Sequence, residues 1–176
     1  KFNFKGCARV RMNYRSANKM DLVKIMEIEN VGFSSEEADT ETAMKERIEL
    51  IHDSFVVATN EKNTPVGYVV GPVIPVRYLY DELFEKTVLN PKSGGYQSIL
   101  SLAIDPNYQK YGIASKLLSE LANISRKRMR SGITLTCLES LIPFYLRNGY
   151  KLEGLSDSSH AGETWYNMVL DLEDEI

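Results

Sequence analysis

The stretch from Leu102 to Ser115, LAIDPNYQKYGIAS, combines residue types that can bind a phosphate. An apolar run ends at Asp105-Pro106, a polar turn follows, and Gly112 precedes a long amphipathic segment, an order that predicts a strand, a turn and a helix. The first N–H groups of a helix have no partner within it and lie at the positive end of its dipole, so they can bind an anion without a cationic side chain. Gly112 and Ala114 leave this backbone accessible to a ligand.

A second stretch that can do chemistry, LIPFYLRNGY, begins at Leu141 in another predicted strand-to-helix unit. Within it, Tyr145 carries a phenol with an ordinary pKa of about 10, which can act as a general acid toward a basic leaving group. The alternative is that Tyr145 is an amphipathic side chain that closes the helix against a sheet. Because the chain contains ten tyrosines, the residue type alone does not decide between these two roles.

The two stretches together resemble the GNAT superfamily of N-acetyltransferases. The run QKYGIA, residues 109–114, is similar to the acetyl-coenzyme A motif Gln/Arg-x-x-Gly-x-Gly/Ala. The run FYLRNGY, residues 144–150, is similar to the Phe-Tyr-x-x-x-Gly-Phe/Tyr motif of the same superfamily. The resemblance covers Met12 to about Leu172. Within the superfamily, Cys137 through Tyr145 looks most like the arylalkylamine (serotonin) N-acetyltransferase branch and its bacterial relatives.

This resemblance implies direct transfer of an acetyl group from acetyl-coenzyme A to a primary amine in a ternary complex, with no metal. It implies that a backbone N–H near Leu102 stabilises the charge that develops on the thioester oxygen. It also implies that the strand pairs with the pantetheine arm of the coenzyme. The cofactor-binding residues implied in this way are Leu102, Ala103, Ile104, Gln109, Lys110, Tyr111, Gly112, Ile113, Ala114 and Ser115.

On the same basis, Tyr145 is the expected general acid for the leaving thiolate. The acceptor of the amine proton stays open between Glu29, Glu139 and an ordered chain of water, and each glutamate has the alternative role of a solvated or amine-binding acid. The departure from the family lies at Ser98 and Leu100, where the vertebrate serotonin enzymes have two histidines, so their proton relay is not expected here. The expected substrate-side residues are Glu27, Phe33, Glu37 and His160.

Length and composition indicate one ordinary domain, since the chain has 176 residues, of which 43% are hydrophobic and 26% charged. We expect residues 12–176 to form it, with residues 1–11 an N-terminal extension, native or added. A net charge of −3 gives no general attraction to nucleic acid or to anionic membranes, so we expect neither partner. The two cysteines, Cys7 and Cys137, and the lack of a long apolar run predict a reduced, cytoplasmic protein.

The elements that must position these residues follow the order β-α-α-β-β-β-α-β-α-β-β. This order predicts an α/β fold with one mixed, mostly antiparallel sheet of about seven strands, flanked by about four helices. The central strand is expected from Tyr96 to Ile104, and the resemblance implies that the sheet is splayed where that strand carries Leu102 to Ile104. Residues 76–94 are read equally well as a substrate lid or as a surface excursion.

Two other functions compete with transfer to a small cationic amine. A domain that binds acetyl-coenzyme A as a sensor or partner module needs no acid, and the presence of Tyr145 speaks against it. Acetylation of a protein N-terminus or a lysine needs an open groove for a peptide. The acidic segment that carries Glu27, Glu29 and Glu37, together with residues 76–94, suits a small cationic amine better. A homodimer is an open alternative to a monomer.

Overall fold

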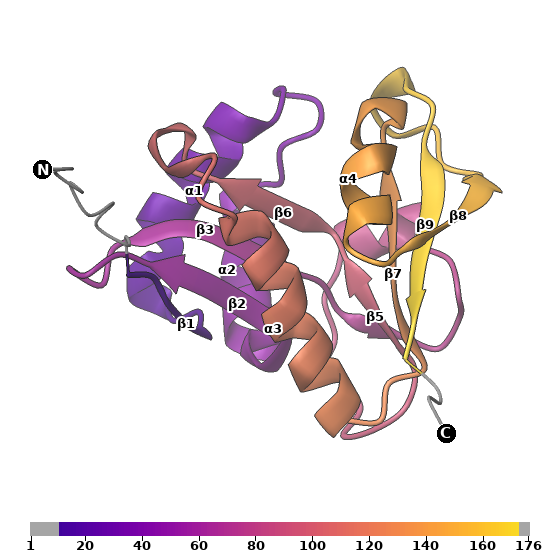
Figure 1. The fold of residues 1–176 in the computed structure, drawn as a ribbon, viewed down its shortest axis with the longest axis horizontal. Helices are drawn as coiled ribbons and strands as arrows, with labels where there is room; N and C mark the ends of the chain where they lie inside the picture. Colours follow the sequence, from indigo (N-terminus) through magenta and orange to yellow (C-terminus); the bar gives the residue numbers. More distant parts are fainter. Residues whose placement is uncertain (1–10, 173–176) are drawn as a thin grey trace, which may run out of the picture.

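The strands form two sheets that diverge from each other (Figure 1). The computed structural model describes residues 11–172, so the expected N-terminal extension lies almost entirely outside the described residues. The first sheet has the order β1-β2-β3-β6 and is antiparallel throughout. Its strands are β1 (Asn13–Ser16), β2 (Phe55–Thr59), β3 (Pro65–Val70) and β6 (Ser101–Ile104).

The second sheet has the order β4-β5-β7-β9-β8. In it β5 and β7 run parallel, and the other neighbours run antiparallel. Its strands are β4 (Val73–Ile74), β5 (Tyr96–Ile99), β7 (Gly132–Cys137), β9 (Tyr166–Asp171) and β8 (Lys151–Leu155). Short 3-10 turns occupy Lys19–Asp21, His52–Ser54, Asp81–Phe84, Pro106–Tyr108, Glu139–Leu141 and His160–Gly162.

One interrupted strand joins the two sheets. The sequence predicts a continuous strand over residues 96–104, whereas the structure divides it at Leu100 into β5 and β6. Ile99 still pairs with β7, but Ser101 pairs with Val70 of β3. The N–H of Leu100 donates to the carbonyl of Val70 at 2.8 Å, which offsets the ladder by one residue in the manner of a β-bulge. The expectation of a single sheet with about seven strands is therefore corrected to nine strands in two sheets within residues 11–172.

The predicted splay is confirmed, because β6 pairs with β3 while β5, directly before it in the chain, pairs with β7. Two helices cover each side of the sheets. The helices α3 (Ile113–Lys127) and α4 (Ile142–Arg147) share one apolar core, and α1 (Leu22–Gly32) and α2 (Glu41–Leu50) pack into the opposite one. Figure 1 shows α3 lying across the junction between the two sheets. Its buried stripe consists of Leu117, Leu118, Leu121 and Ala122.

The insertion segment, residues 76–94, is fixed at both ends. Near its start, Arg77 bridges Glu153 of β8 at 2.7 Å and Asp171 of β9 at 2.8 Å. Near its end, the buried guanidinium of Arg130 donates to two backbone carbonyls of the segment, both at 2.8 Å. Between these ends, the N–H of Thr87 donates to the carboxylate of Glu46 on α2 at 2.6 Å, so the segment is also held from the side of α2.

Candidate active site

A groove of about 690 Å³, here called the long groove, runs along β6 and the start of α3, with α4 on its other side. Nine of the ten residues expected to bind the cofactor line it, namely Leu102, Ala103, Ile104, Gln109, Lys110, Gly112, Ile113, Ala114 and Ser115. Tyr111 does not line it. The residue is 58% exposed, and its ring lies 6.5 Å from the ring of Tyr108, so its role in binding the cofactor stays a prediction.

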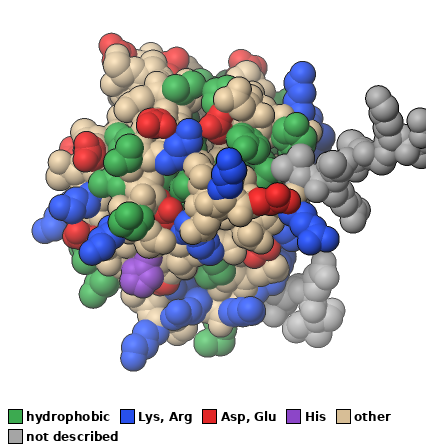
Figure 2. Space-filling model, turned by 90° about the vertical axis from the view of Figure 1, so that its left-hand side faces the viewer, with side chains coloured by type: hydrophobic (Ala, Val, Ile, Leu, Met, Phe, Trp, Pro, Cys, Tyr) green, Lys and Arg blue, Asp and Glu red, His purple; other side chains and the backbone are tan. Residues whose placement is uncertain are grey.

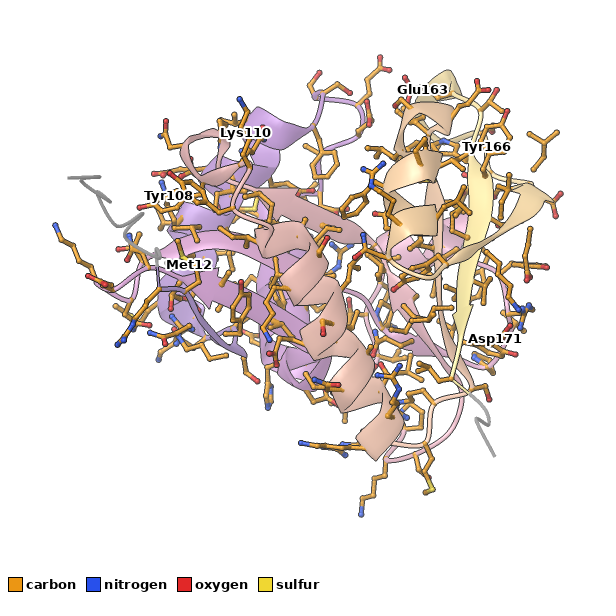
Figure 3. The ribbon with its side chains drawn as sticks, in the orientation of Figure 1. Met12, Tyr108, Lys110, Glu163, Tyr166 and Asp171 are labelled. Atoms are coloured by element: carbon orange, nitrogen blue, oxygen red, sulfur yellow. The ribbon has the colours of Figure 1, made fainter. Side chains whose placement is uncertain are left out.

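The turn before α3 leaves its backbone accessible from outside. Gly112 is the N-cap of α3 with a φ of 72°, and a Cβ added there would meet nothing within 4 Å. Lys110 also has a positive φ, of 76°. Figure 3 shows Tyr108 and Lys110 on this turn, on the side of the molecule where α1 lies. The unpaired N–H groups of the first turn of α3 therefore open toward the long groove.

The edge of β6 supplies backbone groups to the same groove. Asp105 donates its N–H to the carbonyl of Val66 at 2.8 Å. Because bonding directions alternate along an antiparallel pair, the N–H groups of Leu102 and Ile104 point away from β3. β6 is the last strand of its sheet, so these two groups face the divergence between the sheets.

A smaller inner pocket, of about 210 Å³, adjoins the long groove. Five residues line both cavities, namely Gly32, Phe33, Leu102, Leu141 and Tyr145. The two cavities therefore meet at a junction that Tyr145 and Leu102 both line. A molecule in the groove and a molecule in the pocket would come into contact at this junction.

Tyr145 lies on α4 and is 6% exposed. Its ring packs edge-on against Phe144 at 5.0 Å and Tyr150 at 5.6 Å. Burial, and to a lesser extent the neighbouring Cys137 thiol, raises the pKa of Tyr145 above its ordinary value, so the phenol keeps its proton at neutral pH. The predicted acid is therefore a protonated donor at the junction of the two cavities.

Glu29 lies on α1, lines the inner pocket and is only 1% exposed. Its carboxylate accepts hydrogen bonds from the hydroxyl of Tyr68, from the hydroxyl of Ser101 at 2.8 Å and from the N–H of Asp39 at 3.1 Å. Burial raises the pKa of Glu29, and the hydrogen bonds from Tyr68 and Ser101 partly oppose that rise. The structure thus provides a buried carboxyl of raised pKa in the same pocket that Tyr145 lines.

Aromatic side chains from two segments wall the inner pocket. Phe84 of the insertion segment stacks on His160 with ring centroids 5.4 Å apart and an interplanar angle of 7°. The ring of His160 lies 6.1 Å from that of Trp165, whose indole N–H donates to the His160 carbonyl at 2.8 Å. Ser158 donates to Asp81 of the insertion segment at 2.6 Å. The insertion segment therefore forms part of the pocket wall.

Two predicted carboxylates lie outside the inner pocket. Glu27 is exposed and pairs with Lys24 at 3.3 Å. Glu29 points inward, and because residues two apart on an α-helix point to nearly opposite sides, Glu27 points outward. Glu139 is exposed in its 3-10 turn, where Leu138 and Leu141 turn toward the pocket instead. The expected substrate-side residues Phe33, Glu37 and His160 do line the pocket.

Several lining residues have no signal in the two motifs. Phe84, Trp165 and Cys137 lie outside both motifs and line the inner pocket. Phe144 and Arg147 belong to the second motif and line the long groove, although neither is among the expected site residues. Trp165 is the single tryptophan of the sequence, a residue type that is often used where an apolar body and a polar tip are both needed. Burial raises the pKa of the Cys137 thiol to about 11. Tyr68 and Ser101 could be found only from the three-dimensional contacts of Glu29.

No helix within residues 11–172 is both long enough and apolar enough to cross a membrane. In the same range, no three His, Cys, Asp or Glu side chains are grouped so that they could hold a metal ion. Figure 2 shows basic and acidic side chains interspersed on the face it presents.

The sequence model of the Acetyltransferase (GNAT) family matches residues 22–150. Among solved structures, the GphF GNAT-like decarboxylase in complex with isobutyryl-CoA is similar with a TM-score of 0.76 and 16% identity, over 92% of this chain and 100% of that one. Ard1 from Thermoplasma volcanium is similar with a TM-score of 0.71 and 17% identity, over 94% and 100% of the two chains. Arabidopsis thaliana NAA60 in complex with acetyl-CoA has a TM-score of 0.71 and 16% identity, over 93% and 100%. No curated protein sequence matches the chain significantly.

Proposed function

The chain belongs to the acetyltransferase (GNAT) family, and on that premise we propose that it transfers acetyl from acetyl-coenzyme A to the primary amine of a small cationic molecule. As a member of this family it is an acyltransferase with acetyl-coenzyme A as co-substrate. The long groove takes the coenzyme, with phosphate at the first turn of α3 and pantetheine along the edge of β6. The inner pocket takes the amine.

The observation that carries this proposal is the meeting of the two cavities at Tyr145. The amine nitrogen attacks the thioester carbonyl carbon, so a C–N bond forms and the C–S bond breaks. The N–H of Leu102 faces the junction and stabilises the negative charge on the carbonyl oxygen. Tyr145 donates a proton to the departing thiolate, and Glu29 accepts the proton that the amine loses.

The size and lining of the inner pocket support a small amine over a peptide. A volume of about 210 Å³ corresponds to about seven water molecules at about 30 Å³ each. The Phe84–His160 stack and the Asp81–Ser158 hydrogen bond join the insertion segment to the loop before β9 at the wall of this pocket, which narrows the space for a peptide chain. Glu37, which also lines the pocket, favours an acceptor that carries positive charge. A cytoplasmic location and a homodimer stay predictions.

A panel of acceptors tests this proposal by the release of free coenzyme A thiol. The panel contains small diamines, monoamines, acidic amines, alcohols and short peptides with free N-termini. We expect turnover of small amines, fastest for those with a second positive charge. Faster turnover of the peptides would replace the small-molecule acceptor with a protein N-terminus. Coenzyme binding without turnover of any acceptor would favour a non-catalytic binding module.

A further inference from the structure

The carboxylate of Glu29 accepts three hydrogen bonds from the protein. Its Oε2 atom accepts from two hydroxyl groups, those of Tyr68 and Ser101, and its Oε1 atom accepts from the N–H of Asp39. A carboxylate offers about four acceptor positions. Three are used by the protein, so one position remains for a proton donor from the inner pocket.

Tyr68 has no contact with the inner pocket and cannot touch a substrate there. It lies on β3 with 0% exposure, and its ring packs against Phe55 at 5.9 Å. Burial and the nearby charge of Glu29 raise the pKa of Tyr68, so its hydroxyl stays a donor throughout the working range of pH. Ser101 is 3% exposed on β6, one residue before Leu102, and does line the pocket.

The other charged groups near Glu29 leave this arrangement intact. Asp39, whose N–H reaches Glu29, forms an ion pair at 2.7 Å with the fully buried Arg47 of α2. That pair fixes the loop carrying the N–H, and the charge of Asp39 adds to the rise in the pKa of Glu29 that burial causes. The remaining titratable groups around the inner pocket are Glu37, Cys137, Tyr145 and His160.

We propose that Tyr68 and Ser101 are positioning residues, which keep Glu29 deprotonated and orient its free acceptor position toward the incoming amine. A buried carboxyl without donors would take up a proton and could no longer act as a base. The two hydroxyls stabilise the charged form while burial keeps the carboxylate basic. The role of Glu29 as proton acceptor rests on the proposed function, but the arrangement of its donors does not.

The first test measures the titration of Glu29 itself, by NMR of ¹³C-labelled glutamate carboxyl groups in the unliganded protein. The Glu29 signal is assigned by its loss in Glu29→Gln. In Tyr68→Phe we expect the midpoint to rise by about one pH unit or more, because a hydrogen bond to a charged group is worth about that much. Ser101→Ala should shift it in the same direction.

A matched control separates this role from packing. Tyr150→Phe also removes the hydroxyl of a buried tyrosine, one that has no hydrogen-bond partner among the described residues. The titration of Glu29 should not move in that variant. Unchanged titration of Glu29 in folded Tyr68→Phe and Ser101→Ala would overturn the proposal, and if Tyr68→Phe does not fold, Ser101→Ala decides alone.

The second test uses the pH dependence of kcat/KM with the best acceptor. Glu29 must be deprotonated to accept a proton, so activity rises as the pH passes its pKa, and loss of a donor moves this acid limb to higher pH. We expect the acid limb of kcat/KM to move to higher pH in Tyr68→Phe and in Ser101→Ala. A variant that is only less stable would instead lose activity at every pH without a shift of this limb. If no acceptor is turned over but the NMR midpoint moves, the proposed function fails and the positioning role stands. If acceptors are turned over and neither the midpoint nor the limb moves, the positioning role fails alone.

Discussion

Tyr145 and Tyr150 pack ring against ring in a T-shaped pair with centroids 5.6 Å apart, and both are almost fully buried. Their hydroxyl groups nevertheless have different surroundings. Tyr145 lines both cavities, whereas the hydroxyl of Tyr150 is buried without a hydrogen-bond partner in the part of the chain that the structure describes. Removing the hydroxyl group from each of these two tyrosines in turn therefore distinguishes a chemical role of the hydroxyl from a packing role of the ring.

Tyr145→Phe should lower turnover by about 10²- to 10⁴-fold, which is the usual effect of one positioned proton donor. Coenzyme A affinity should stay near that of the parent, because backbone groups on β6 and α3 hold the coenzyme. Tyr150→Phe should retain turnover and melt at an equal or higher temperature, since it removes an unpaired buried hydroxyl. Steady-state kinetics and thermal melts measure both. Equal turnover of the two variants would return Tyr145 to a packing role.

Gly112→Asp should abolish the rise in melting temperature that coenzyme A causes, since it places bulk and negative charge at the phosphate site. Gly154→Asp is the matched control, because Gly154 also has a positive φ, of 83°, and open space around an added Cβ, but lies on β8. Both variants should carry a similar backbone strain of about 1 kcal/mol. A full coenzyme-induced shift in Gly112→Asp would show that the phosphate binds elsewhere.

Glu37→Gln should raise KM for a cationic acceptor and reduce the dependence of KM on salt, because Glu37 lines the inner pocket. Glu27→Gln removes the same charge from the same acidic region, but Glu27 is exposed and pairs with Lys24. We therefore expect a smaller effect from it. The comparison is made from KM at several salt concentrations, and equal effects would mean that only the general potential of the surface matters.

Phe84→Ala should raise KM for the acceptor while leaving coenzyme affinity unchanged, because Phe84 lines the inner pocket and not the long groove. Tyr80→Ala removes a large ring from the same segment at a position that is 41% exposed, and it should have little effect. Isothermal titration with coenzyme A and acceptor kinetics separate the two sites. Parental acceptor KM in Phe84→Ala would make the insertion segment a surface excursion.

The ion pair between Arg77 and Glu153 should make the free energy of unfolding depend on pH in the acid range. Hydrogen bonding from Arg77 lowers the pKa of Glu153 to about 2, below the unfolded value of about 4.3. This stabilisation is present above the unfolded pKa and is lost as the pH falls toward 2. Arg77→Met should therefore be less stable by roughly 1 kcal/mol near neutral pH, since partly exposed pairs contribute little, and the difference from the parent should vanish near pH 2.

Urea denaturation at a series of pH values measures this difference. Lys116→Met is the control, because Lys116 pairs with Glu120 at 3.3 Å on the exposed face of α3, where the pair contributes less. A constant difference between parent and Arg77→Met at every pH would assign the effect of Arg77 to packing alone.

The sequence predicts local elements well and contacts between distant segments poorly. The turn at Gly112 and the predicted acid Tyr145 lie within short motifs that resemble those of a known family, and nine of the ten cofactor residues that this resemblance implies line the long groove. Glu27 and Glu139 lie outside the inner pocket, which the sequence does not predict because a carboxylate near a motif can point to either side of its helix or turn. The break at Leu100 cannot be foreseen, since the apolar run continues on both sides of it and the change of partner depends on β3 and β7.

The unpaired edge of β6 is a hazard for any soluble protein, because an open strand edge can pair with another chain and begin aggregation. Here the edge lies inside the long groove, and side chains of α4, among them Phe144 and Arg147, form the opposite wall. A strand that belongs to another sheet would carry neighbouring strands into this space, and we expect α4 to obstruct them, whereas the proposed pantetheine arm is a single chain. The divergence that is proposed to receive the coenzyme should therefore also limit pairing of this edge with other copies of the molecule.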